Sequence, residues 1–506
     1  MKPIKHAIIF FLTICCSFLS FGQKQNIDYK HQVFLTGNIC DAVNDDHFFS
    51  SLETTLKNTR QPFSLILNGD LTDAKSGSEK WIEQINRIKF LIKTTEQLPQ
   101  GKIILWAGDR DWNQSRKGGQ KQFRKLEKEI KSFIKDNDFK RTEWANKKGC
   151  LGPDTYELDE SLLLIVANSQ WWNHPFDKPR SEDGLCKIIT SEDFAEELES
   201  EVNENQDKNI IIAGHHPFES FGNYGGHFSF VDHLKPFPII GSFKTAYHKN
   251  IGTPEDISNK HLHAYREEFH NLFFFHKNLI YVSAHEKNQQ IIRDGENYLI
   301  NSGAPSKGKY ADQHENALVS SSKPGIIVLN YFDSGKIESS FLEKKEEKLI
   351  AQKNHLLFLS SCIEGSLNKE NTPINYSYAP CLSKEKAAKK LERFYPDTIT
   401  IAGPEYKSGT WKKIWLGKHY RTTWTQPVKV PSLDLDNTFG GLTIYKKGGG
   451  RQTTSLKFKA TDGTQYTFRS VNKDPSKAFN YTLRPTFITP LMRDQTSTQS
   501  PYGAMA

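Results

Sequence analysis

Short apolar runs alternate with longer segments of helical periodicity between about residue 33 and residue 343. The apolar runs are rich in Ile, Leu, Val or Phe and predict buried strands at 33–37, 63–68, 102–107, 162–168, 209–214 and 279–283. The segments between them predict helices at 47–58, 79–95, 120–136, 191–202 and 260–273. This alternation predicts an α/β domain whose strand ends gather at one edge.

The rest of the chain lacks this alternation. The domain is expected to span residues 23–343 and to end in a meander of strands at 298–301, 325–331 and 336–341. A charged stretch then predicts a linker at 344–360. Residues 361–506 predict a small β-rich region with strands at 433–445, 454–460 and 465–471. Its Gly448–Gly450 run predicts a hairpin turn, because no Gly-Lys-Ser/Thr follows it as in a phosphate loop.

The N-terminus predicts export. Lys2 and Lys5 precede an apolar run that ends at Phe21, and Gly22 offers a small residue for cleavage, so residues 1–22 are expected to be a signal peptide. An exported chain meets oxidising conditions, which favours disulfides. We expect the pairs Cys150–Cys186 and Cys362–Cys381, with Cys40 left over; buried thiols are the alternative. No later apolar run approaches membrane-spanning length, so the mature chain is expected to be soluble.

The composition, 37% hydrophobic, 25% charged and 12% aromatic, excludes a disordered, collagenous or coiled-coil chain. The charge is uneven. Residues 351–506 hold 23 Lys and Arg against 11 Asp and Glu, and residues 1–350 hold 44 against 48. The C-terminal region is therefore basic. It is expected either to contact an anionic membrane surface or an acidic partner, or to be a solvated surface without a ligand; no nucleic acid is expected.

Polar side chains follow each predicted strand of the domain directly. These strand-end residues are Asn38 and Cys40, Asp70, Asp109 to Asp111, Asn168 to Gln170, His215 and His216, and His285 to Lys287. Carboxylates and imidazoles brought to one edge would suit Zn, Fe or Mn. Singly, each is a weak signal, because an Asp after a strand is more often a turn former and a lone buried His more often a satisfied core residue.

With these residues in this order, the segment 31–345 resembles the calcineurin-like metallophosphoesterases, a family that includes the purple acid phosphatases. Gly69–Asp73 matches the family's Gly-Asp-x-x-Asp element, and His215 fits its lone His. Further features look like a bacterial branch of the family: Trp171-Trp172, His216-Pro217, Gly225-Gly226 and Asn301–Ala304. The resemblance implies a four-layer α/β/β/α sandwich and a site for two metals.

The departures from the family pattern concern the first metal. Its ligand positions are Asn38, sometimes Cys40, bridging Asp70, and Lys287. An ammonium group cannot be a ligand, so this first site is expected to be lost. Asn38 removes one negative charge, and we expect Lys287 to replace the ion by forming a salt bridge with Asp70.

The set for the second metal is complete: Asp70, Asp109, His215 and His285. The resemblance therefore implies either one divalent transition metal (Zn, Fe or Mn) or none. In the catalytic segment, Arg110 and Asp111 follow Asp109, and Arg110 stands where the family has its catalytic His. A guanidinium cannot act as a general acid near neutral pH; it is expected to bind a phosphate or to pair with Asp111.

Two functions follow as leading hypotheses, with an unrelated activity of the C-terminal region as a third. One is an exported pseudo-phosphoesterase that serves as a binding or assembly module for a protein partner in the envelope of a Gram-negative bacterium, in the periplasm or at the outer membrane. The other is a one-metal phosphoester hydrolase. The C-terminal region, including Trp424 and the Tyr466–Ser470 segment, looks like one that follows such domains in longer envelope proteins, so the chain is expected to be a fragment of one.

Overall fold

The computed structural model describes residues 29–179, 186–235 and 237–360. Beyond these it describes shorter segments: 377–379, 398–401, 406, 417, 419–430, 435, 438–448, 455–469 and 497–498. The predicted signal peptide at 1–22 and the predicted Cys362–Cys381 pair lie outside the described residues. Within the described part of the chain, no helix has the length and apolar character needed to cross a bilayer.

The first large sheet has eight strands. In spatial order they are β15 Ser377–Ala379, β14 Lys348–Ser360, β13 Ile337–Lys345, β12 Gly325–Phe332, β1 Tyr29–Thr36, β2 Phe63–Asn68, β3 Gly101–Trp106 and β4 Thr142–Trp144. Strands β1 to β4 run parallel, and β12 joins β1 antiparallel. The residues of β2 are all buried, which explains why a continuous apolar run predicted it with correct bounds.

The second large sheet has seven strands. In spatial order they are β11 Ala317–Ser321, β9 Gln289–Asp294, β10 Asn297–Ser302, β8 Leu279–Ser283, β7 Asn209–Ala213, β6 Leu162–Val166 and β5 Asp154–Asp159. Strands β6, β7, β8 and β10 are parallel to one another. Their carboxyl ends therefore meet at one edge of the sheet, as the carboxyl ends of β1, β2 and β3 do in the first.

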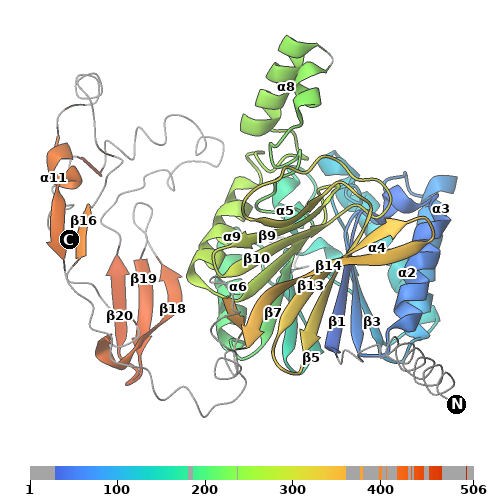
Figure 1. The fold of residues 1–506 in the computed structure, drawn as a ribbon, viewed down its shortest axis with the longest axis horizontal. Coiled ribbons are helices and arrows are strands. Elements are labelled where there is room, and N and C mark those ends of the chain that lie inside the picture. Colours follow the sequence, from blue (N-terminus) through green and yellow to red (C-terminus); the bar gives the residue numbers. More distant parts are fainter. Residues whose placement is uncertain are drawn as a thin grey trace, which may run out of the picture.

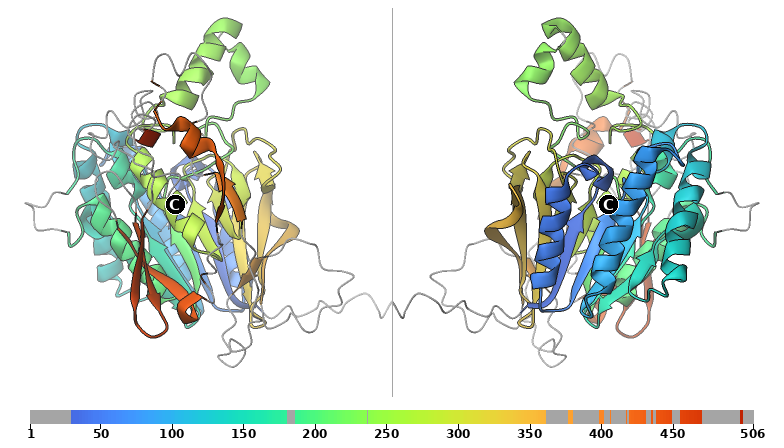
Figure 2. Two further views of the ribbon diagram at one scale, coloured as in Figure 1. Left: turned by 90° about the vertical axis from the view of Figure 1, so that its left-hand side faces the viewer. Right: turned by 90° about the vertical axis from the view of Figure 1, so that its right-hand side faces the viewer.

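The two sheets pack face to face, with helices on both outer faces (Figures 1 and 2). The layer between the sheets is apolar and includes Leu35 and Ile66 from one sheet and Ile211 and Ile280 from the other. Helices α2 (Asp46–Asn58), α3 (Glu79–Glu96) and α4 (Gly119–Asp136) cover the first sheet. Helices α6 (Ser191–Glu204) and α9 (His263–Phe275) cover the second. This confirms the predicted α/β/β/α sandwich.

Two predictions about the end of the domain differ from the structure. The three strands expected in one meander are divided, because β10 belongs to the second sheet and β12 and β13 to the first. The stretch predicted as a linker, 344–360, instead contains β14, with Leu357 and Phe358 fully buried. Its charges suggested a linker, but a strand near a sheet edge carries such charges where it faces water.

The C-terminal region contains two small sheets, β16 (Thr398–Ile401) with β17 (Pro427–Val430), and the antiparallel trio β18 (Leu442–Gly448), β19 (Ser455–Ala460) and β20 (Gln465–Arg469). This confirms the predicted small β-rich region. Gly448 pairs with Ser455, while Gly449 and Gly450 of the predicted turn lie outside the described residues. In the main domain, Cys150 and Cys186 form the predicted disulfide and Cys40 is a buried free thiol.

Candidate functional site

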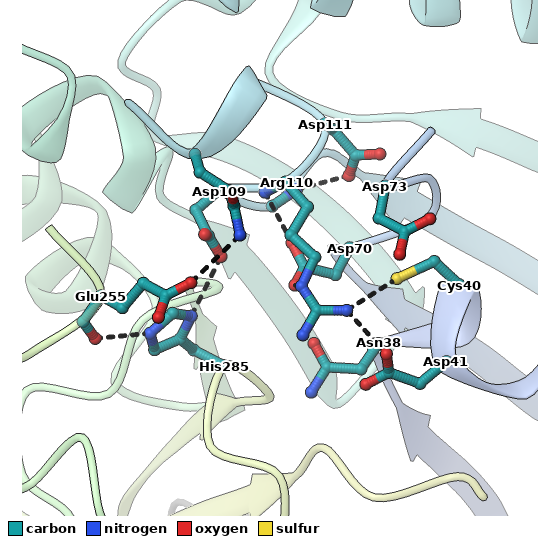
Figure 3. A network of polar contacts seen from close by, with 12 residues as sticks. Asn38, Cys40, Asp41, Asp70, Asp73, Asp109, Arg110, Asp111, Glu255 and His285 are labelled. Carbon is teal, nitrogen blue, oxygen red and sulfur yellow. Dashed lines mark hydrogen bonds and ion pairs between the residues drawn. The ribbon is translucent and has the colours of Figure 1, made fainter. Parts of the chain in front are cut away.

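The strand ends of both sheets bring the predicted polar residues to one place. Asn38 and Cys40 follow β1, Asp70 follows β2, and Asp109 and Arg110 follow β3. The second sheet contributes His215 after β7 and the segment His285–Lys287 after β8. Figure 3 shows Arg110 lying between Asp70 and the Cys40–Asp41 turn, while His285 faces Asp109 on the other side.

Two glycines let the loops at these strand ends approach one another closely. A Cβ on Gly69, whose φ is +76°, would lie 2.4 Å from Nδ1 of His215, and a Cβ on Gly108 would lie 2.4 Å from the Asp70 carboxylate. Asp70 itself has a φ of 53°, in the left-handed region that non-glycine residues seldom adopt. The backbone is therefore bent to bring the Asp70 carboxylate against its neighbours.

The four residues predicted for the second metal converge. Oδ1 of Asp109 lies 3.0 Å from Nε2 of His215 and 3.0 Å from Nδ1 of His285. Nε2 of His215 lies 3.3 Å from Oδ1 of Asp70 and 3.3 Å from Nδ1 of His285. All four side chains are at most 4% exposed. The ligand atoms thus form two overlapping buried groups, one with Asp70 and His215 and one with His285 and His216, which share Asp109.

The second nitrogen of each imidazole makes a hydrogen bond that is compatible with metal binding by the first. Nδ1 of His215 lies 2.9 Å from the Asn68 carbonyl oxygen, and Nε2 of His285 lies 2.7 Å from that of Glu255. A carbonyl can only accept, so each of these nitrogens donates, and in the neutral ring the opposite lone pair faces Asp109. Ligand atoms about 2.1 Å from a tetrahedral zinc lie about 3.4 Å apart. The spacings of Asp109 to His215 and His285 are close to that value, so the groups around Asp109 could hold a divalent ion.

Without an ion, the same cluster holds its charge by proton sharing. Burial favours the protonated form of Asp109, but His285 and His215 hold the pKa of Asp109 well below its usual value. Burial opposes a charged His285, yet Asp109 raises the pKa of that imidazole to about 9. Burial and the charge of Asp109 raise the pKa of Asp70. A proton on His285 and a metal ion would therefore compete for the same lone pair.

The place expected for the first metal is filled by side-chain cations. Nε of Arg110 lies 3.1 Å from Oδ2 of Asp70, and its Nη1 lies 2.7 Å from Oδ1 of Asp41. Nη1 also donates to Sγ of Cys40 at 3.1 Å. Nζ of Lys287 lies 2.8 Å from Oδ2 of Asp41. Because Arg110 and Lys287 already pair with the carboxylates here, the residues at this position do not fit a metal ion.

The predicted Lys287–Asp70 salt bridge is wrong in its partner. Lys287 turns into the site, with 18% of its side chain exposed, but it pairs with Asp41, and the cation beside Asp70 is Arg110. Arg110 reaches Asp70 because it comes from the neighbouring strand end, and the Arg110 backbone amide also donates to Oδ1 of Asp70 at 3.0 Å. Asp70, Cys40 and Asp41 raise the pKa of Arg110 despite its burial, so the guanidinium is a permanent cation.

The other two first-metal positions are used internally. Asn38 donates from Nδ2 to the carbonyl oxygens of Ala284 and Gly303, both at 2.7 Å, and so ties the two sheets together. Burial raises the pKa of the Cys40 thiol well above its usual value, although Arg110 opposes this. Cys40 is therefore a neutral thiol that accepts a hydrogen bond.

Asp111, one of the candidate catalytic residues, has a structural position. Its Oδ1 accepts hydrogen bonds from the amide and hydroxyl of Thr72, at 2.7 and 2.9 Å. Its Oδ2 accepts from the amides of Leu71 and Gly108, at 3.0 and 2.8 Å. Asp111 is fully buried. It fixes the two loops that carry Asp70 and Asp109, and the expected Arg110–Asp111 pair is replaced by the pairs of Arg110 with Asp41 and Asp70.

Sequence reasoning missed Asp41 and Glu255, and it named His216 as a strand-end residue but not as a ligand. Asp41 directly follows Cys40 and could have been found as a further carboxylate at a strand end. His216 packs its ring 4.5 Å from that of His285 and, with Asp109, completes a second group of potential ligands. Glu255 lies in a loop without any pattern, so its contact with His285 had no signal in the sequence.

Comparisons with known proteins concern the fold. No protein-family model and no curated protein matches the chain significantly. Similar solved structures include GAP50, the anchor in the inner membrane complex of Plasmodium, with 14% identity, a TM-score of 0.37, and coverage of 66% of this chain and 90% of that one. The purple acid phosphatase PPD1 from yellow lupin (Lupinus luteus) seeds has 11% identity, a TM-score of 0.37, and coverage of 64% and 53%.

PhoD is a third similar structure, with 8% identity, a TM-score of 0.40, and coverage of 65% of this chain and 69% of PhoD. The chain thus spans about half the length of the lupin protein. The site consists of side chains around Asp109 that could hold a divalent ion, beside the ion pairs of Arg110 with Asp70 and of Lys287 with Asp41.

Proposed function

We propose that this protein is an exported pseudo-phosphoesterase of the calcineurin-like type, which keeps the fold as a binding or assembly module in the cell envelope. A dimetal phosphoesterase activates a water between two ions and needs an acid for the leaving group. Here one ion position is closed and Arg110 stands in the place of the acid. The chain therefore lacks two parts of that mechanism.

The observation that carries the proposal is the contact of Arg110 with Asp70. Asp70 is the residue that would bridge two metals, and its Oδ2 is held by Nε of Arg110 at 3.1 Å in a site that is almost closed to water. The Arg110 guanidinium is charged, and a buried pair that loses one member is strongly destabilised. A metal would have to displace a guanidinium that is also held by Asp41.

Asp41 completes the replacement of the ion. Burial would raise its pKa, but Arg110 and Lys287 hold it below the usual value, so Asp41 is ionised. Two carboxylates, Asp41 and Asp70, thus face two cations, Arg110 and Lys287. This balance explains why Asn38 does not need to be a carboxylate here: no further positive charge remains for it to neutralise.

A restoration experiment tests this proposal. Purified mature protein is assayed with p-nitrophenyl phosphate and bis-p-nitrophenyl phosphate in the presence of Mn²⁺, Zn²⁺ or Fe²⁺, beside the triple variant Asn38→Asp, Arg110→His, Lys287→His. We expect no hydrolysis by the natural chain and a gain of metal binding by the variant. Metal-dependent turnover by the natural chain, lost on chelation, would contradict the proposal. The single variant Lys80→Met, at an exposed ion pair outside the site, serves as the matched control.

The alternative is a one-metal phosphoester hydrolase. It is favoured by the two groups of potential ligands that share Asp109, with the donor nitrogens of His215 and His285 turned away from it. An ion held there would polarise a phosphoryl oxygen and make bound water more acidic. Arg110 would then clamp the phosphate. Arg110→Ala should abolish binding of phosphate analogues such as vanadate in this case, and should leave binding of a protein partner untouched in the first.

The location of the protein is part of the same proposal. The Cys150–Cys186 disulfide is compatible with an oxidising compartment, and we infer the periplasm or the outer-membrane surface of a Gram-negative bacterium. The basic C-terminal region would suit an anionic membrane surface or an acidic protein partner. Fractionation of cells that express the full chain tests this; recovery in the cytoplasm with reduced cysteines would contradict it.

A further inference from the structure

A helical hairpin projects from the domain with its apolar side chains in water. It consists of α7 (Phe230–Leu234) and α8 (Pro238–Asn250), and α8 stands clear of the sandwich in all three views (Figures 1 and 2). The side chains of Phe230, Phe237 and Phe243 are 77%, 67% and 74% exposed. Scattered exposed apolar residues are ordinary, but a contiguous group of large ones marks a surface that meets a partner.

The exposed apolar residues of α8 follow a helical spacing. Ile240, Phe243, Tyr247 and Ile251 are three or four residues apart and so lie along one face of the helix, with exposures of 54%, 74%, 47% and 62%. In a globular domain such a stripe would pack on the core. Here it is exposed to solvent, so α8 presents an apolar face that no other described element covers.

The polar contacts of the hairpin hold it in this orientation. Asp232 accepts hydrogen bonds from the amide and hydroxyl of Ser229 at the start of α7, at 2.9 and 2.6 Å. Oγ1 of Thr245 lies 3.1 Å from Nδ1 of His233, which joins the two helices. Nδ1 of His248 lies 2.8 Å from the buried Asp256 of the following loop. The apolar face is thus presented by an organised element.

The charge around this face is positive. Residues 227–252 contain three lysines, Lys235, Lys244 and Lys249, all exposed, and a single carboxylate, Asp232, which is used within the hairpin. By contrast, residues 1–350 as a whole carry an excess of negative charge, with 44 Lys and Arg against 48 Asp and Glu. The hairpin therefore carries a net positive charge, with Lys244 at the edge of the apolar stripe and Lys249 on the opposite side of α8, near Gly226.

We propose that this hairpin, residues 229–251, docks on a bilayer surface that carries anionic headgroups. Aromatic and aliphatic side chains on one face with lysines beside them are the pattern of an interfacial helix, whose apolar face enters the boundary between headgroups and acyl chains. The lysines pair with the phosphates of anionic lipids. The site is distinct from the basic C-terminal region and does not depend on the proposed pseudo-phosphoesterase function.

Vesicle binding of the full mature chain tests this inference. Co-sedimentation is measured with phosphatidylcholine vesicles and with vesicles of phosphatidylcholine and phosphatidylglycerol in a ratio of about 7:3. We expect binding to the mixed vesicles that weakens with salt. The double variant Ile240→Ser, Phe243→Ser should bind at least about tenfold more weakly, because each lost side chain removes buried apolar area. Phe274→Ser, at an 82% exposed position on α9, is the matched control and should bind normally.

A charge variant keeps the test independent of the fold of α8. Lys244→Glu with Lys249→Glu alters only exposed side chains and should also reduce binding to the mixed vesicles, with an unchanged circular dichroism spectrum. Equal binding by natural chain and both variants would overturn the inference and place the lipid contact elsewhere in the chain. Absence of vesicle binding would also overturn the inference. Self-association of the natural chain in analytical ultracentrifugation, if the serine variant abolishes it, would overturn the inference in favour of a second copy as the partner.

Discussion

Replacing Arg110 with Met removes the cation beside Asp70 and tests whether it stabilises the site. The Arg110 side chain is 11% exposed and that of Asp70 is 1% exposed, so the Asp70 carboxylate would lose a buried partner at 3.1 Å. Removing one member of a buried pair costs about 3–5 kcal/mol. Asp70 keeps His215 at 3.3 Å and an amide donor, so we expect a loss near the lower end, about 3 kcal/mol.

The assay is urea unfolding at pH 7.5, followed by tryptophan fluorescence. Lys80→Met is the control, because the Lys80–Asp73 pair is exposed and is expected to contribute at most about 1 kcal/mol. If Arg110 takes the place of an ion, Zn²⁺ or Mn²⁺ should stabilise the Arg110→Met variant more than the natural chain. A loss no greater than that of Lys80→Met would refute the assignment of Arg110 as the cation that replaces the metal.

Three further changes test the surroundings of the site. Asp111→Asn places an NH₂ group opposite backbone N–H donors. It should lower the unfolding free energy by about 2–3 kcal/mol without altering the metal content. Burial lowers the pKa of His31 from 6.5 to about 4, so between these pH values the folded chain binds fewer protons than the unfolded chain. The unfolding free energy therefore falls as the pH is lowered through this range, by at most about 1.4 kcal/mol per pH unit. His31→Asn should reduce this dependence of the unfolding free energy on pH. Replacing Cys150 and Cys186 with Ser should cost about 2–4 kcal/mol, because the bond closes a loop of sequence separation 36.

Each of these has a clear contrary result. A stable Asp111→Asn variant with less bound metal would assign Asp111 to the site itself. An unchanged acid slope in His31→Asn, measured by urea midpoints from pH 7 to pH 4, would show that other groups carry the titration. A Cys150→Ser, Cys186→Ser variant as stable as the natural chain would mean that the disulfide adds nothing to stability.

Apolar periodicity was sufficient to predict most strands and the α/β class, whereas the four-layer sandwich was implied by the family resemblance. Strands such as β2 and β8 are buried on every residue, so their sequences contain an uninterrupted apolar run whose ends coincide with the strand ends. The same signal failed for β14, whose charged first half resembles a linker. It also could not assign β10 to a sheet, because pairing depends on contacts between residues distant in sequence.

The composition of the site could be predicted, but its pairing could not. The strand-end positions of Asp70, Asp109, His215 and His285 could be predicted, since parallel strands end at one edge, but their choice as a ligand set was implied by the family resemblance. The choice of Asp41 as the partner of Lys287 depends on the turn after β1, and that of Asp70 for Arg110 depends on the distance between two loops. Neither is encoded in a local pattern.

The number of divalent ions that each chain binds tests the central claim most directly. Mature protein is stripped with a chelator, titrated with Zn²⁺ and with Mn²⁺ in a calorimeter, and analysed for metal content after dialysis, with a chromogenic phosphoester assayed in parallel. The closed first position predicts no more than one ion per chain and no turnover. Two ions per chain, with hydrolysis that follows their binding, would contradict it.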